Sequence, residues 1–425
     1  MGLVLSTTVP VAAHGINERV SIGQGGVQGD NSSQAASAMS PDVRFVVFSS
    51  YASNLVPGND SNHESDAFVR DRQTGTTERI SQTPSGTAGN DWSGSHSISA
   101  DGRFVVFYSY ASNLVAGDTN HKSDVFVRDR KTGTTQRINL GRDGAQGNGR
   151  SFSGPISADG RFVAFSSGAS NLVPGDTNGS FDAFVHDRKS GTIRRVSLGL
   201  GGVQGNGHST SQAMSPDGRF IVLWSEASNL VPGDTNNEAD IFVLDRKLGT
   251  TERVSVGQDG TQGNDDGDSD SGAAISADGR FVAFCSSASN LVPSDTNNES
   301  DVFVRDRQTG TTQRVSVGRS GAQGNGHIFG ATMSADGRFV AFSSHASNLV
   351  PGDTNESRDA FVHDRKTGMT RRVSVGPGGV QGNGKSHYPT ISADGRFVAF
   401  VSDAGNLVAG DTNDVGDVFF RTLVP

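Results

Sequence analysis

The chain has only one cysteine, Cys285, among its 425 residues. A single thiol excludes an intrachain disulfide framework and a cysteine-based zinc cluster. Long hydrophobic runs are also missing, since none approaches the roughly 20 apolar residues of a membrane-spanning helix. Positive charge is in deficit, because 36 Lys and Arg stand against 45 Asp and Glu, and a net charge of −9 would repel a phosphate backbone. We therefore expect neither a transmembrane segment nor a nucleic-acid partner.

Glycine is abundant, with 56 residues, and this composition favours many turns over long helices. The block S-[AP]-D-x-R-F occurs seven times, at intervals of 58 to 61 residues. Its aspartates are Asp42, Asp101, Asp159, Asp217, Asp278, Asp336 and Asp394. A fixed period of this length is typical of a repeat architecture, so the chain is predicted to contain seven copies of one unit.

Each unit is predicted to hold four extended segments and no helix. In the second unit these segments are residues 96–99, 103–109, 123–129 and 135–139. The Asp-Gly pair between the first two segments is a hairpin signal. The second segment, RFVVFYS, is apolar on both faces and too short for a helix, which is typical of a strand buried on both sides. The unit is therefore predicted to be a four-stranded antiparallel sheet.

Seven sheets that are apolar on both faces must stack against one another, and radial closure of such a stack gives a β-propeller. The seventh unit ends after its third strand, at residues 419–421, whereas an unpartnered copy of the fourth strand, residues 18–22, precedes the first unit. We therefore predict an all-β, seven-bladed propeller that forms a single domain over residues 17–425. Its N-terminal strand, residues 17–23, is predicted to complete blade 7.

Residues 1–16 lie outside this predicted propeller. Residues 3–13 (LVLSTTVPVAA) are apolar and end in small residues, as the core and cleavage site of a secretory signal do, but no basic segment precedes them. The segment is interpreted either as the remnant of a signal peptide or as a frayed tail. On the first interpretation the protein is secreted or periplasmic, which is the location that we expect.

The pattern S-[AP]-D-G-R-F-[VI]-x-F-S, followed by D-[VAI]-F-V-x-D-R-x-[TS]-G, resembles that of TolB-type, WD-repeat-like propellers, and the resemblance covers residues 17–422. Val43 departs from the pattern at a glycine and Cys285 departs from it at a serine. The family includes periplasmic adaptors, propellers associated with peptidases and many secreted proteins. The resemblance therefore implies a fold and a binding platform, not a reaction.

Strand direction assigns the connections of each unit to the two faces of the propeller. If the first strand is innermost, the D-G turn and the D-R-x-[TS]-G turn share one face, which we call the bottom. The long loop A-S-N-L-V-P-G-D-T-N and the glycine-rich link to the next blade then share the other face, the top. Long polar loops on a rigid scaffold usually carry binding, so the top face is expected to be the functional one.

Each long top loop contains the pattern D-x-N-x-x-x-D. Its residues are Asp60, Asn62 and Asp66; Asp118, Asn120 and Asp124; Asp176, Asn178 and Asp182; Asp234, Asn236 and Asp240; Asp295, Asn297 and Asp301; Asp353, Asn355 and Asp359; and Asp411, Asn413 and Asp417. Oxygen ligands at positions 1 and 3, with a later carboxylate, resemble the opening of EF-hand and FG-GAP calcium loops. Alternatively, Asp and Asn form Asx turns and the last Asp caps the third strand. No motif requires a cofactor, and calcium is the ion that these loops would suit.

One position differs between the copies, nine residues before the aspartate of the block. It holds Ser33, Trp92, Arg150, His208, Ser269, His327 and Lys385, and Phe152, Phe329, His387 and Tyr388 lie close to it in the sequence. Because the inner strands of a propeller begin at the mouth of its channel, we expect a mixed ring of aromatic and cationic groups there. Such a ring would suit an anionic or glycan ligand. The alternative is sequence drift at an unconstrained position.

The function predicted from these features is that of a non-enzymatic binding or scaffold protein. It would engage a protein or glycan ligand through the top face, as a monomer. The motifs G-x-S-x-G and H-E-x-x-H are missing, and the ten histidines are scattered over different loops. Two alternatives stay open, an enzyme of the lyase or hydrolase type in the channel mouth and a multivalent glycan-binding lectin. A lectin of that kind should repeat an aromatic residue in every blade, whereas Trp92 has no counterpart.

Overall fold

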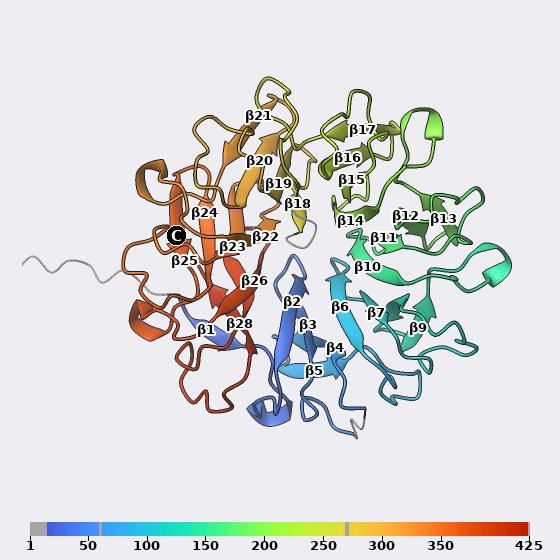
Figure 1. The fold of residues 1–425 in the computed structure, drawn as a ribbon. Coiled ribbons are helices and arrows are strands. Elements are labelled where there is room, and N and C mark those ends of the chain that lie inside the picture. The colour runs from blue at the N-terminus through green and yellow to red at the C-terminus, as the bar shows by residue number, and fades with distance from the viewer. Residues whose placement is uncertain (1–14, 59–61, 268–271, 424–425) are drawn as a thin grey trace, which may run out of the picture.

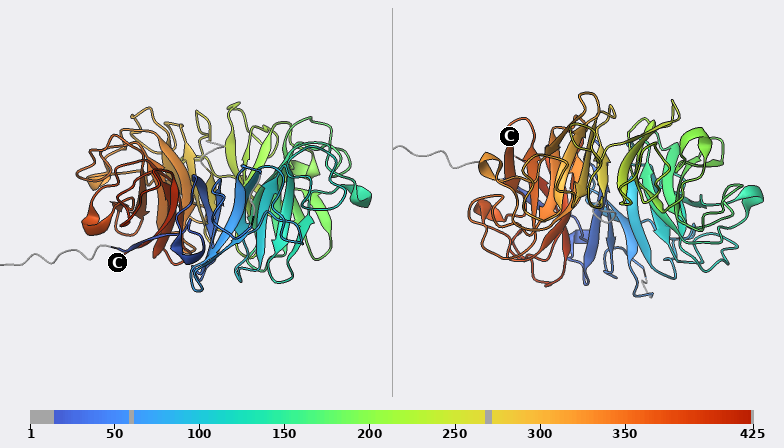
Figure 2. Two further views of the ribbon diagram at one scale, coloured as in Figure 1. Left: turned by 90° about the horizontal axis from the view of Figure 1, so that it is seen from below. Right: turned by 45° about the horizontal axis from the view of Figure 1, so that its top comes forward.

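In the computed structural model, seven four-stranded antiparallel sheets are arranged as blades around a central axis (Figure 1). The structure describes residues 15–58, 62–267 and 272–423. The side views show one closed ring with loops on both faces (Figure 2). The predicted all-β, seven-bladed propeller is therefore confirmed.

Within each blade the strands follow one another in sequence order, from the axis outward. The last blade differs only in its outermost strand, which is the N-terminal β1. The innermost strands are β2 (Ser33–Met39), β6 (Ser93–Ile98), β10 (Ser151–Ile156), β14 (Ser209–Met214), β18 (Ala273–Ile275), β22 (Ile328–Met333) and β26 (Ser386–Ile391). The second strands are β3 (Phe45–Ser50), β7 (Phe104–Ser109), β11 (Phe162–Ser167), β15 (Phe220–Ser225), β19 (Phe281–Ser286), β23 (Phe339–Ser344) and β27 (Phe397–Ser402).

The outer half of each blade consists of the third and fourth strands. The third strands are β4 (Asp66–Asp71), β8 (Asp124–Asp129), β12 (Asp182–Asp187), β16 (Asp240–Asp245), β20 (Asp301–Asp306), β24 (Asp359–Asp364) and β28 (Asp417–Thr422). At the rim lie β5 (Thr76–Arg79), β9 (Thr134–Arg137), β13 (Thr192–Arg195), β17 (Thr250–Arg253), β21 (Thr311–Arg314), β25 (Met369–Arg372) and β1 (Asn17–Arg19).

Short 3-10 helices occur in the links between blades. They are η1 (Gln24–Gly26), η2 (Arg142–Gly144), η3 (Leu200–Gly202), η4 (Arg319–Gly321) and η5 (Pro377–Gly379). Across the described part of the chain, we find no helix with the length and apolarity needed to cross a membrane.

Apolar side chains from neighbouring blades form the core between them. One cluster joins Val47 and Val69 of blade 1 to Val105, Phe107 and Phe126 of blade 2, all of which are fully buried. Phe107 and Phe126 stack with 5.4 Å between ring centroids, and the equivalent pairs stack in other blades. Full burial of one such side chain stabilises the fold by about 1.5–3 kcal/mol, so these contacts hold blade against blade. The prediction that the strands are buried on both faces is confirmed.

The ring is closed by the N-terminal strand. β1 pairs with β28, with Glu18 opposite Phe420, and the Val20 amide donates to the Val418 carbonyl at 2.7 Å. The predicted completion of blade 7 is confirmed, although regular pairing covers residues 17–19 rather than 17–23. Residues 1–14, which carry the predicted signal remnant or tail, lie outside the described residues.

A serine and an aspartate of the repeated block hold the turn between the first two strands. In blade 2, Ser99 Oγ donates to Asp101 Oδ1 at 2.6 Å, and Gly102 has a φ of 70°. A Cβ on Gly102 would meet the ring of Phe45 in blade 1 at 2.2 Å, so both the backbone and the packing favour glycine here. Val43 takes the same place in blade 1 with a φ of 56°, a strained conformation for a β-branched residue.

Hydrogen bonds between connections confirm the predicted division into two faces. On the bottom, Arg130 in the outer turn of blade 2 donates to the carbonyl of Gly102 in the inner turn at 2.7 Å. On the top, the amide of Asn90 in a glycine-rich link donates to Asn113 Oδ1 in a long loop at 3.0 Å. Each top loop is thereby fixed to a neighbouring link, and the top face is a rigid surface.

Candidate functional site

The acidic residues of the top loops face an arginine from the rim strand of the same blade. In blade 2, Arg137 lies 2.9 Å from Asp118 and 3.0 Å from Asp124, and all three side chains are less than a tenth exposed. Asn139 also donates to Asp124, at 2.5 Å. Burial raises the pKa of Asp118, and the attraction of Arg137 opposes this shift. The two carboxylates are thus held by a guanidinium.

This ion-pair arrangement recurs around the ring. The arginines are Arg19, Arg79, Arg137, Arg195, Arg253, Arg314 and Arg372, each within 3.4 Å of at least one loop carboxylate. Asp60 of blade 1 lies outside the described residues, whereas its partners in the motif, Asn62 and Asp66, are described. A single geometry therefore serves every blade, including blade 7, where β1 supplies the arginine.

The asparagine of the loop motif forms the turn that the alternative interpretation predicted. Asn120 Oδ1 accepts the Lys122 amide at 3.1 Å, and Asn120 Nδ2 donates to Asp124 at 3.0 Å and to the Gly147 carbonyl at 3.1 Å. The amide nitrogen, not the oxygen, therefore points at the carboxylate, and the carbonyl oxygen already has a donor. The structural role of the motif is clear in these contacts, while calcium binding by the loops stays a prediction.

Backbone hydrogen bonds identify the equivalent mouth position in each blade. The amide that follows the second strand donates to the carbonyl of Trp92, Arg150, His208, His327 and Lys385 in blades 2, 3, 4, 6 and 7. In blades 1 and 5 this amide donates to the carbonyls of Ser32 and Asp266. The prediction that Ser33 and Ser269, nine residues before the aspartate of the block, take the equivalent position was therefore wrong. The extra residue of blade 1 forms a bulge in β2, and blade 5 has a longer link before β18. Ser269 lies outside the described residues.

An aromatic arc crosses the mouth from blade 2 to blade 4. Ring centroids are 4.9 Å apart for Trp92 and Tyr108, 5.4 Å for Tyr108 and Phe152, and 5.8 Å for Phe152 and Phe181. His208 ends the arc, 6.2 Å from Phe181, and its Nδ1 accepts the Phe181 amide at 2.9 Å. This contact leaves the proton of a neutral His208 on Nε2. Phe152 and Phe181 are stacked, whereas Tyr108 is tilted by 55° to Trp92 and meets Phe152 edge-on at 78°.

A basic cluster occupies the mouth at blades 6 and 7. The Arg358 guanidinium lies over the Phe329 ring at 3.6 Å, and the rings of His327 and His345 contact Phe329 at 4.6 and 5.9 Å. Burial lowers the pKa of His345, and the positive charges of Arg358, His327 and Lys385 lower it further. The cluster therefore places the cations Arg358 and Lys385 near two histidines, with Glu299 at 3.9 Å from His327, on a protein whose net charge is −9.

A hollow of about 480 Å³ at blades 7, 1 and 2 lies between these two groups. Its walls include Trp92, Tyr108, His387, Tyr388 and Asp403. Burial lowers the pKa of His387, and the charge of Asp403 opposes the shift. The structure thus brings the predicted residues Trp92, His387 and Tyr388 to one cavity.

The other predicted mouth residues are distributed between the two groups. Phe152 and His208 belong to the aromatic arc, and His327 and Lys385 belong to the basic cluster. Arg150 is exposed at blade 3, where its carbonyl accepts the Gly168 amide. The predicted residues therefore form two distinct groups and a hollow instead of one mixed ring.

Sequence reasoning missed four residues of these groups, namely Tyr108, Phe181, His345 and Arg358. They lie on the second strand, just after it, or just before the third strand, where most other blades carry smaller residues. These positions vary between otherwise similar copies of the repeat, and that variation, the criterion used for the mouth position, could have identified them. They adjoin the nearly invariant blocks of the repeat, so their variation was missed.

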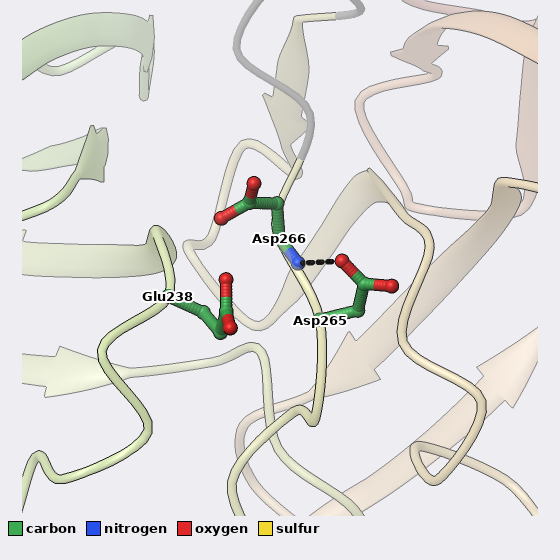
Figure 3. Close-up of side chains that lie close together, drawn as sticks. All are labelled: Glu238, Asp265 and Asp266. Atoms are coloured by element: carbon green, nitrogen blue, oxygen red, sulfur yellow. Dashed lines mark hydrogen bonds between the residues drawn. The ribbon is translucent and has the colours of Figure 1, made fainter.

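An acidic trio lies at blades 4 and 5, where Glu238 of a long loop approaches Asp265 and Asp266 of the next link (Figure 3). One oxygen from each side chain lies within 4.8 Å of the others, so the trio could hold a metal ion. The Asp266 amide donates to Asp265 Oδ1 at 2.8 Å, and the Ala239 amide donates to Asp266 Oδ1 at 2.9 Å. A hydrogen bond with Asp266, together with its charge, raises the pKa of Glu238.

The chain is similar to known proteins in fold rather than in sequence. No protein-family model matches it, and no curated protein matches it. An oligogalacturonate lyase in complex with manganese aligns with a TM-score of 0.56 and 12% identity, over 97% of this chain and 94% of that one. The oligogalacturonate lyase of Vibrio parahaemolyticus aligns with a TM-score of 0.54 and 12% identity, over 97% of both chains.

A TolB structure is also among the solved structures that align with this chain. TolB from Acinetobacter baumannii is 15% identical over 72% of this chain and 58% of that one, with a TM-score of 0.41. At these identities the two alignments with TM-scores above 0.5 support the propeller fold alone. The finer assignment to TolB-type propellers stays a prediction.

Proposed function

We propose that the protein is a binding propeller whose top mouth takes a ligand with acidic groups and flat rings, an acidic glycan or an acidic protein segment. The observation that supports this proposal is that an aromatic arc and a basic cluster lie at the same channel mouth. The aromatic arc belongs to blades 2 to 4 and the basic cluster to blades 6 and 7. These blades lie on opposite sides of the central axis (Figure 1). One ligand that spans the mouth could touch both.

The chemistry of each group suits a different part of such a ligand. Arg358 is held against Phe329, so its planar guanidinium is oriented before a carboxylate arrives, and less side-chain freedom is lost on binding. Trp92 and Tyr108 offer faces on which a sugar ring or an aromatic side chain can stack. Screening limits the reach of the net charge to roughly 10 Å, so the local positive potential decides at contact.

A single mouth site also distinguishes this proposal from a multivalent lectin. The aromatic arc involves blades 2, 3 and 4, and the basic cluster involves blades 6 and 7. The blades therefore differ where they meet the channel although their cores repeat. We propose one asymmetric site on a monomeric, secreted or periplasmic protein that requires no cofactor for its fold.

The test uses oligogalacturonate as an acidic glycan and polyglutamate as an acidic peptide, each measured by calorimetry with and without calcium. We expect at least one of them to bind, and Trp92→Ala and Lys385→Ala to weaken it by about tenfold. Lys131→Ala is the matched control, because Lys131 is an exposed lysine of a bottom turn. If neither mouth variant changes the affinity of a bound probe, the mouth is not the site.

A channel-mouth lyase is the second candidate function. Its supporting observation is that burial lowers the pKa values of His345 and His387, so both are neutral at pH 7 and can accept a proton beside the Arg358 guanidinium. Proton abstraction next to a carboxylate needs such a base and such a cation. Incubation with oligogalacturonate, followed by mass spectrometry, tests it. Shortened unsaturated products that His387→Gln abolishes would favour the enzyme, and intact substrate would favour the binding protein.

A further inference from the structure

A hollow of the described structure lies at the rim, in the seam between blades 3 and 4, away from the top mouth. Its volume is about 910 Å³, which is within the usual range of small-molecule sites. The rim strands β13 and β17 and the helix η3 border it, and its lining includes Leu198, Leu200, Leu230, Leu244, Arg194 and Arg246. Because the blades are copies of one unit, the residues of this seam can be compared with the equivalent residues of the other seams.

The hollow lies where four other blades carry an arginine, and blades 3 and 6 carry His186 and His363 at that position. In blade 1, Arg70 donates to Thr77 Oγ1 at 3.1 Å and reaches the Ile22 carbonyl of the preceding blade at 3.5 Å. Arg128 and Arg305 make the same two kinds of contact in blades 2 and 5. Blade 4 has Leu244 at this position while Thr251, the equivalent of Thr77, is retained. The shorter side chain of Leu244 leaves the space open and makes its wall apolar.

The charge of this seam is reversed as well. In three seams a glutamate on the rim strand pairs with an arginine of the next blade, at distances of 2.8–2.9 Å: Glu18 with Arg72, Glu78 with Arg130, and Glu252 with Arg307. In the seam between blades 3 and 4 the glutamate is replaced by Arg194, which faces Arg246. Burial lowers the pKa of Arg246; the charge of Asp187 opposes the shift, and the charges of Arg161 and Arg194 add to it. Two cations thus meet where an acid and a cation meet in three other seams, while the remaining rim strands carry Gln136, Gln313 and Arg371 at this position.

A third departure adds exposed apolar surface. Leu200 in η3 is 70% exposed at the edge of the hollow. The equivalent residues in the other six links are Gln24, Pro84, Arg142, Gln258, Arg319 and Pro377. An exposed leucine costs free energy in water, and burial by a ligand would recover about 25 cal/mol per Å². Three independent departures from the repeat therefore meet at one seam.

We propose that this seam is a second ligand site, for a small amphiphilic anion such as a medium-chain carboxylate. The anionic head lies between Arg194 and Arg246, and the apolar chain lies along Leu198, Leu200 and Leu244. Charge complementarity supports the head group, since Arg194 and Arg246 both border the hollow, and Asp187, the carboxylate on its wall, is paired with Arg161. Arg161, the next cation on the wall, is already paired with Asp187 at 2.7 Å. The apolar walls favour a hydrocarbon chain over a sugar.

The test compares decanoate, decanol and decyltrimethylammonium by calorimetry on the full-length protein. We expect decanoate to bind more tightly than decanol, and decyltrimethylammonium not to bind. Leu244→Arg and Arg194→Glu restore the residues of sister blades, so both variants should fold, and their thermal melts check this. Leu244→Arg is expected to fill the hollow and weaken decanoate by about tenfold or more. Arg194→Glu is expected to weaken decanoate by about tenfold and to leave decanol unchanged.

Two control variants separate this site from other effects. Leu248→Thr also restores the sister residue, at a turn position that is 67% exposed and does not line the hollow, and it should bind decanoate as the wild type does. Lys385→Ala alters the top mouth and should likewise have no effect. The proposal is overturned if decanoate does not bind, if decanol binds equally well, or if Leu244→Arg retains full affinity.

Discussion

Replacement of Arg19 by alanine should weaken the attachment of β1, the strand that closes the ring, to the last blade. Arg19 lies 2.9 Å from Asp411 and 3.2 Å from Asp417, and it joins the N-terminal strand to the last blade. Its side chain is 8% exposed, and Asp417 is fully buried. The alanine variant leaves two buried carboxylates without their cation. Ser21 Oγ, which donates to Asp417 at 2.5 Å, would remain.

The magnitude follows from the burial of this group. Removal of one partner of a buried ion pair costs about 3–5 kcal/mol, because the remaining charge is left without compensation. β1 pairs with β28 through Asn17–Arg19, and within the described residues no other strand of the propeller precedes it. A loss of this size should therefore appear as local opening of β1, more frequent by a factor of about one hundred or more.

Limited proteolysis is the assay, with the cleavage rate near β1 measured by mass spectrometry. The matched control is Arg137→Ala, which breaks the same ion pair in blade 2, where the chain continues from the rim strand in both directions. Both variants should lose similar stability in urea, but only Arg19→Ala should be cut rapidly near residue 19. Equal cleavage of Arg19→Ala and wild type would refute this account of closure.

Three further predictions concern strain, pH and metal. Val43→Gly should raise the free energy of unfolding by about 1 kcal/mol in urea, since it relieves a positive φ; a lower value would mean that packing of the valine matters more. The Arg103 ion pair lowers the pKa of Asp129 to about 2, and burial lowers that of His186 to about 4. Protonation of His186 should therefore lower the free energy of unfolding as pH falls from 6.5 towards 4. The stabilisation from the Asp129 carboxylate should be lost at lower pH, from about 3.8 to about 2. Urea unfolding of the wild type, His186→Asn and Asp129→Asn across this pH range would separate the two effects. Calcium should raise the melting temperature of Arg137→Ala more than that of the wild type, because the freed carboxylates of Asp118 and Asp124 can bind it; no shift in either protein would leave the loop motif a structural one.

The arrangement of the mouth shows where sequence reasoning stopped. The position of Trp92 was found because the copies differ there, and its placement at the channel mouth followed from the blade topology. Asp266 was not found, because the longer link before β18 shifted the count to Ser269. Arg358 and Phe329 are 29 residues apart in the sequence, and only the folded chain places a guanidinium over that ring. The partner of a side chain depends on how the blades pack against one another, and spacing along the sequence does not reveal it.

The sequence by itself determined the number of blades, the order of strands and the closure by the N-terminus. These features depend on local patterns, namely the Asp-Gly turn, short strands that are apolar on both faces, and a period of 58 to 61 residues. Only the tertiary structure decided that Arg137 holds the loop carboxylates, that two unlike groups share the mouth, and that Leu244 and Arg194 open one seam. The physical reason is that residues of different blades become neighbours when the blades pack, and their charge and size are then either matched or unmatched.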